Sequence, residues 1–88
     1  MDYDDIDKVL RYAKKVLLRA EHFWNMEKYI WAIAKAENVI GRLCAVVPLL
    51  SNAQWKKYKD KYDAVYDAAR NLRDDAVERL EALGQPYM

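Results

Sequence analysis

Glu37 is the side chain in this sequence that most invites chemistry, because it interrupts an otherwise apolar side of a predicted helix. With about 100° of rotation per residue, it lies opposite the polar arc of that helix and beside Ile33, Ile40 and Cys44. A buried, unpartnered carboxylate is costly and needs hydrogen-bond donors, a cation or a proton. Three interpretations stay open: tyrosine hydroxyls satisfy it, it forms a ligand or proton site in the core, or the helix register leaves it exposed.

The residues that nucleophilic or metal-dependent catalysis requires are not spaced to act together. A nucleophile needs a Ser or Cys beside a His, but His22, the single histidine, should point away from the core where Cys44 is expected. No set of His, Cys and carboxylates has metal-ligand spacing. The two glycines, Gly41 and Gly84, form no phosphate-binding loop. We therefore predict no catalytic residues, no metal site and no cofactor, and a protein that is not an enzyme.

The composition favours one small helical domain over residues 1–88. The chain is 53% hydrophobic with only two Gly and two Pro, which argues against disorder. Its formal net charge of +1 selects neither nucleic acid, an acidic partner nor a membrane. The acidic start lacks the pattern of a signal peptide and no apolar run is long enough to span a bilayer, so we expect a cytoplasmic protein without a membrane partner.

Apolar periodicity predicts an all-α fold, an antiparallel three-helix bundle with a long C-terminal helix, with helices at about 5–24, 26–47 and 52–83. The middle helix is apolar around most of its circumference, so we expect its two neighbours to cover it. Its polar arc holds Lys28, Lys35, Asn38 and Arg42, with Trp31 between them. Ser51 followed by Gln54 predicts a capping box at the start of the third helix.

Three antiparallel helices with short connections would place the middle of each helix at a similar height. This argument brings tyrosines from the third helix, and in reserve one from the first, close to Glu37. We therefore predict a buried polar site made of Glu37, Tyr62, Tyr66 and Tyr12.

Basic side chains recur at three- or four-residue steps on the outer side of the first helix. They form either a solvated face, partly neutralised by nearby acids, or a surface that docks onto an acidic protein or a phosphate backbone. No aromatic ring stands among them, which favours an acidic protein over nucleic acid. This basic ridge consists of Lys8, Arg11, Lys15, Arg19 and His22.

The third helix, at about 30 residues, should extend past the turn that joins the first two. Its last apolar side chains, Val77, Leu80 and Leu83, would then be exposed and form a self-association stripe. Alternatively, this end folds back on Phe23 and Trp24.

The first half of the chain has spaced alanines, an aromatic-bearing turn and a following KY..A...A pattern, carried by Ala20, Phe23, Tyr29, Ala32, Ala36, Gly41 and Leu43. This segment is similar to a family of short archaeal helical proteins of unknown function. More loosely, it resembles microtubule-interacting-and-transport domains and tetratricopeptide hairpins. The resemblance implies a helical hairpin, although no second repeat follows as a tetratricopeptide array requires.

Three functions are compatible with these features. The first is a non-catalytic protein–protein interaction module that binds another protein through the basic ridge or dimerises through the third helix. The second is a small nucleic-acid-associated protein in which the ridge, with Lys56, Lys57 and Lys59, contacts phosphates. The third is an inhibitor or regulator from a phage or mobile element, of the antitoxin or anti-defence type, that acts by binding a host protein.

Overall fold

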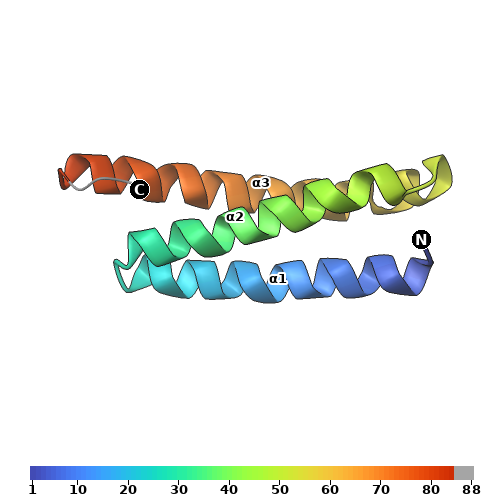
Figure 1. Cartoon of the computed structure of the whole chain (residues 1–88), viewed down its shortest axis with the longest axis horizontal. Helices are drawn as coiled ribbons and strands as arrows, with labels where there is room; N and C mark the ends of the chain where they lie inside the picture. Colours follow the sequence, from blue (N-terminus) through green and yellow to red (C-terminus); the bar gives the residue numbers. More distant parts are fainter. Residues whose placement is uncertain (85–88) are drawn as a thin grey trace.

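A computed structural model describes residues 1–84, and within them the chain forms three long helices and no strand (Figure 1). α1 covers Tyr3–Asn25, α2 covers Tyr29–Val46 and α3 covers Asn52–Ala82, with a short 3₁₀ turn, η1, at Val47–Leu49 between the last two. The helices pack as an antiparallel bundle with principal extents of 46 × 19 × 18 Å. The predicted all-α three-helix bundle with a long C-terminal helix is confirmed.

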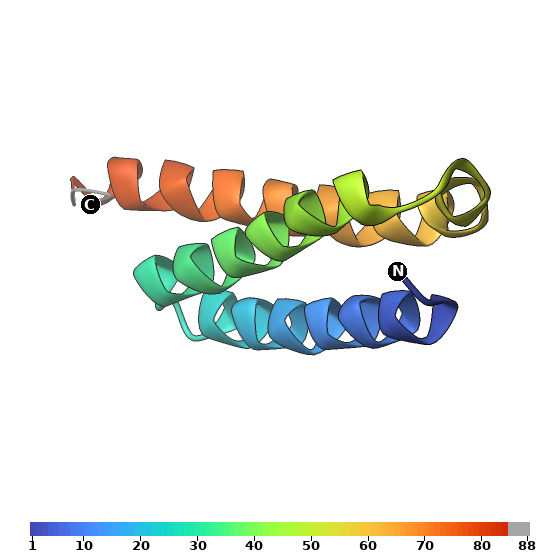
Figure 2. The ribbon, with the colours of Figure 1, turned by 45° about the vertical axis from the view of Figure 1, so that its right-hand side comes forward.

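α2 runs obliquely between the other two helices, beginning beside the end of α1 and ending near the start of α3 (Figure 2). It contacts both neighbours more extensively than they contact each other. The C-terminal end of α3 extends beyond the turn that joins α1 and α2 (Figure 1).

The turn between α1 and α2 is closed by backbone hydrogen bonds. Glu27 has a positive φ of 60°, and the amide of Lys28 donates to the carbonyl of Phe23 at 2.9 Å while that of Glu27 donates to Trp24 at 3.0 Å. This pair of bonds is the Schellman pattern, which ends a helix on a left-handed residue. Because α1 continues through Asn25 and three residues form the turn, α2 starts at Tyr29 rather than at residue 26.

The capping box at the start of α3 is confirmed. The Ser51 hydroxyl accepts a hydrogen bond from the Gln54 amide at 3.2 Å, and the Gln54 side-chain oxygen accepts one from the Ser51 amide at 3.0 Å. Gln54 is itself buried, and its side-chain nitrogen donates to the carbonyl oxygen of Met1. The box therefore fixes where α3 begins and also holds the start of the chain against it.

The core runs along the axis of the bundle in two clusters. The larger one joins all three helices, with Ala13, Val39 and Val65 among its buried members. The smaller one lies at the end of the bundle where α1 turns into α2, and joins Tyr29 and Ile33 to Ala76 and Leu80. Fully buried alanines on each helix allow the backbones to approach closely.

The expected contact of α2 with both neighbouring helices is confirmed, but the two neighbours cover less of its circumference than expected. Its buried residues form one stripe, because two neighbours on adjacent sides of a helix cover only one arc of its circumference. Glu37 and Cys44 lie outside this arc and are exposed, so the expected burial of both is incorrect. The stripe consists of Tyr29, Ala32, Ile33, Ala36, Val39, Leu43 and Val46.

Candidate binding surfaces

Glu37 is exposed, so the polar site predicted around it is not buried. Tyr62 is buried on α3, where its ring stacks on Tyr66 with centroids 6.0 Å apart and meets Trp55 edge-on at 5.3 Å. Burial, followed by the neighbouring Cys44, raises the pKa of Tyr62 to about 12. These tyrosines belong to the packing of the bundle, so no enclosed proton or ligand site surrounds the carboxylate.

Tyr12, the reserve member of that site, lies on the opposite side of α2. The guanidinium of Arg42 stands 4.3 Å from the centroid of the Tyr12 ring, a distance typical of a cation–π contact. The same guanidinium donates from Nε to the side-chain oxygen of Asn38 at 2.9 Å. Tyr12 thus belongs to the surface between α1 and α2, beside the basic ridge.

All five residues of the basic ridge are exposed. Three of them, Lys8, Arg11 and Lys15, join Tyr12 in lining a shallow hollow of about 250 Å³. The ridge was predicted to lack an aromatic ring, but Tyr12 supplies one. In the sequence, its spacing of three and four residues from Lys15 and Lys8 was the signal for this placement.

Two contacts fix the register between α1 and α2. Tyr12 is paired with Arg42, and the ring of Phe23 lies 5.6 Å from that of Trp31. Arg19 lies one helical turn before Phe23 on α1, and Lys35 lies one turn after Trp31 on α2. Arg19 is also seven residues from Tyr12, and Lys35 is seven residues from Arg42. From this register we infer that Arg19 and Lys35 lie across from one another.

We call this surface the basic seam. It alternates rings and cations along the junction of the two helices, and α2 contributes as much of it as α1. The polar arc of α2 was visible in the sequence, but its position beside the basic ridge was not. The basic seam consists of Tyr12, Arg19, Phe23, Trp31, Lys35 and Arg42.

Acidic side chains stand near part of this surface, since Asp7 lines a further hollow with Arg11 and Lys14. On α3, ion pairs join Lys59 to Asp63, Arg73 to Asp74 and Arg79 to Asp75. Although the net charge is only +1, cations from α1 and α2 gather on one side of the protein.

The end of α3 is covered by α2, which corrects the predicted self-association stripe. Leu80 is 2% exposed and packs with Tyr29 and Ile33, and Val77 packs against the same cluster beside Trp24. Only Leu83 remains exposed, at 62%. The first residues of α2 reach α3 at this end of the bundle, so Val77 and Leu80 pack in the core.

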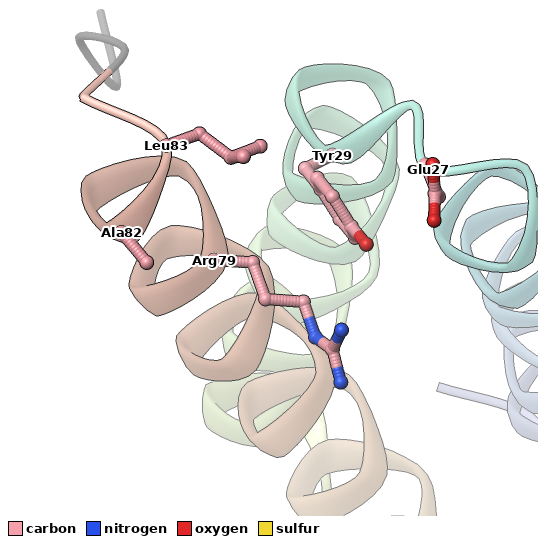
Figure 3. Close-up of a pocket in the computed structure, with 5 residues that line it drawn as sticks. All are labelled: Glu27, Tyr29, Arg79, Ala82 and Leu83. Atoms are coloured by element: carbon pink, nitrogen blue, oxygen red, sulfur yellow. The ribbon is translucent and has the colours of Figure 1, made fainter.

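Two open hollows adjoin this end of the bundle. The first, of about 370 Å³, is lined by Glu27, Tyr29, Arg79, Ala82 and Leu83. Figure 3 shows Leu83 and Arg79 projecting from α3 toward Tyr29 on α2. The second hollow, of about 290 Å³, shares part of this lining and adds Ile30 and Trp31.

The polar groups at the first hollow form hydrogen bonds with one another. Arg79 Nε donates to a carboxylate oxygen of Asp75 at 2.9 Å, and the Trp24 indole donates to the same oxygen at 2.6 Å. The Arg79 guanidinium also stands 4.7 Å from the Trp24 ring. Asp75, followed by Tyr29, raises the pKa of Arg79. These contacts hold α3 against the turn between α1 and α2. We therefore interpret the group as structural.

No cluster of three or more His, Cys, Asp or Glu side chains suited to a metal ion occurs in residues 1–84. Within that same part of the chain, none of the helices combines the length and the apolar character that crossing a membrane requires.

No known protein family, characterised protein or solved structure matches this chain.

Proposed function

We propose that this protein is a non-catalytic binding module that holds an extended polyanion on the basic ridge and basic seam. The observation that carries the proposal is the convergence of cations from two helices on one surface. Lys8, Arg11 and Lys15 approach from α1, and Lys35 and Arg42 from α2. The chemistry of this surface is electrostatic, since it is made mainly of cations and aromatic rings.

Like charges that face one another across a helix junction disfavour the folded state unless an anion lies between them. Arg19 and Lys35 are such a pair by the register of α1 and α2. A bound polyanion would neutralise both and would also reach Arg42 and the ridge. Because these groups are solvated, the attraction should weaken steeply with salt.

A matched pair of charge variants tests the proposal. Arg19→Gln with Lys35→Gln removes two charges from the basic seam, and Lys56→Gln with Arg70→Gln removes two from exposed positions on α3. Both variants change the net charge equally. Binding of a fluorescent heparin fragment, measured by anisotropy at low salt, should weaken by about tenfold or more in the seam variant and stay near that of the parent protein in the α3 variant. Equal losses in both would show that binding follows bulk charge and not this surface.

Self-association at the end of the bundle is a second candidate function, with a second copy of the chain as the partner. Ile30, Trp31 and Leu83 are more than half exposed and stand beside the two hollows. Leu83→Asp is the informative variant, because Leu80→Asp would place a charge in the core. Light scattering after size exclusion should show a dimer that Leu83→Asp converts to a monomer. A monomeric parent protein would exclude this candidate.

A further inference from the structure

We infer that the polyanion is a single-stranded nucleic acid, whose bases stack on Trp31 and Tyr12 while its phosphates contact Arg19, Lys35 and Arg42. This inference rests on the proposed function and specifies its ligand. It depends on the rings of the basic seam, which the charge argument does not use.

Trp31 is unusually open for so large an apolar side chain, at 61% exposed, and Tyr12 is 46% exposed. Burial of aromatic rings is among the strongest stabilising contributions in a bundle, so two open rings on one seam leave stabilising energy unused in the free protein. The two rings flank the pair formed by Arg19 and Lys35. A ligand that uses the whole seam must therefore offer flat apolar faces as well as negative charge.

The Trp31 indole is supported from beneath. Phe23 is half-buried, and its ring contacts that of Trp31 at a centroid distance of 5.6 Å with an interplanar angle of 41°. This contact restrains the indole while most of its surface faces solvent. A restrained ring with an open face is a platform for a nucleobase.

Tyr12 and Arg42 form the matching platform at the other end. The guanidinium lies over the ring at 4.3 Å and is held by Asn38. A guanidinium fixed in this way presents both a planar face for a base and donors for a phosphate. Trp31 and Arg42 are eleven residues apart on α2, about 16 Å along the helix axis, which is about the length of five stacked nucleotides.

An acidic protein segment fits this surface less well. Its carboxylates would neutralise the cations, but it has no regular series of flat faces to cover Trp31 and Tyr12. Duplex DNA also fits less well, because its bases are already stacked and paired and present only their edges. Unpaired bases alone use the cations and the rings together.

The test compares three fluorescent probes: a twelve-nucleotide oligothymidylate, a poly-glutamate peptide with the same number of charges, and a duplex of the same length, which carries about twice the charge. The parent protein should bind the single strand at least tenfold more tightly than the other two. Trp31→Leu, which keeps an apolar side chain but removes the ring, should weaken single-strand binding by about tenfold or more and leave poly-glutamate binding unchanged. Leu49→Ala, at an exposed apolar position in η1 outside the ridge and the seam, is the control and should change neither.

Salt dependence supplies an independent readout. Arg42→Gln should reduce the slope of log affinity against log salt for the single strand by about one, as expected for one lost phosphate contact. Trp31→Leu should leave that slope unchanged, because stacking releases no counterions. Circular dichroism and thermal unfolding of each variant verify that the bundle is retained.

The outcomes separate the inference from the proposed function. If the single strand and poly-glutamate bind alike and Trp31→Leu affects neither, the ligand assignment is overturned while polyanion binding stands. If the duplex binds most tightly, the stacking role is overturned as well. If none of the three probes binds at low salt, both the inference and the proposed function are wrong.

Discussion

Aromatic rings gather on both sides of α2, but they are used differently on each side. Toward α3, Tyr62 is 8% exposed, stacks on Tyr66 and meets Trp55, so its ring is enclosed by other rings. Toward α1, Tyr12 and Trp31 are open to solvent and share their surface with cations. The same residue types stabilise the fold on one side and form a surface available to a ligand on the other.

Neighbouring charge explains the difference. Burying the rings of the basic seam under another helix would also bury Arg19, Lys35 and Arg42, and desolvating unpaired cations is too costly for a small bundle. Tyr62 instead lies among the rings of Trp55 and Tyr66 and interacts with the thiol of Cys44. The cations therefore keep the α1–α2 side open.

The largest expected effect is a contrast in stability between the two sides. Tyr62→Ala should lower the free energy of unfolding by about 3–5 kcal/mol, because it leaves a cavity among packed rings. Tyr12→Ala should lower it by less than about 1 kcal/mol, since an exposed cation–π contact contributes little. Denaturant unfolding of both variants measures the difference. Similar losses would mean that the two sides do not differ as proposed.

The second contrast concerns pH. The pKa of Tyr62 is about 12 in the folded protein against 10.0 for an unperturbed tyrosine. Above pH 10 the unfolded chain loses this proton first, so the contribution is present below pH 10 and is lost as the pH rises from about 10 to 12. Tyr62→Phe should make the loss of stability over this range shallower, while Tyr12→Phe should follow the parent protein. Thermal unfolding at about pH 9, 11 and 12 measures this loss of stability.

The smallest expected effect tests the link between Tyr12 and Arg42. A double-mutant cycle with Tyr12→Leu and Arg42→Gln should give a coupling of about 0.5–1 kcal/mol in unfolding free energy, as for other exposed cation–π pairs. Arg42→Gln keeps a donor near Asn38, which isolates the ring contact. A coupling of zero would show that the guanidinium does not depend on the ring for its position.

Local features of this protein were predictable because neighbouring residues determine them. The Ser51 and Gln54 capping box is complete within four residues, and it formed as predicted. The three helices follow from apolar periodicity, with the largest shift in a boundary at the start of α2. There, the backbone of Glu27 is in the left-handed conformation that usually ends a helix at a glycine. Because the residue is a glutamate, its type did not indicate this turn.

The surfaces were harder to predict, because they depend on how helices are placed relative to one another. Glu37 was expected inside because α2 is so apolar, and Leu80 was expected outside because α3 is so long. Both expectations failed for one reason: α2 covers the end of α3 and is itself covered along one stripe. The basic ridge was correctly placed on the outside of α1, since its residues share one helix face.

By itself, the sequence determined the number of helices, the direction of their apolar faces and the row of cations on α1. Each of these follows from apolar or basic residues that recur at spacings of three and four along one helix. Only the tertiary structure decided that the cations and Trp31 of α2 stand beside that row, and that Glu37 meets water. Register and crossing between helices arise from the packing of many side chains at once, and no local pattern encodes them.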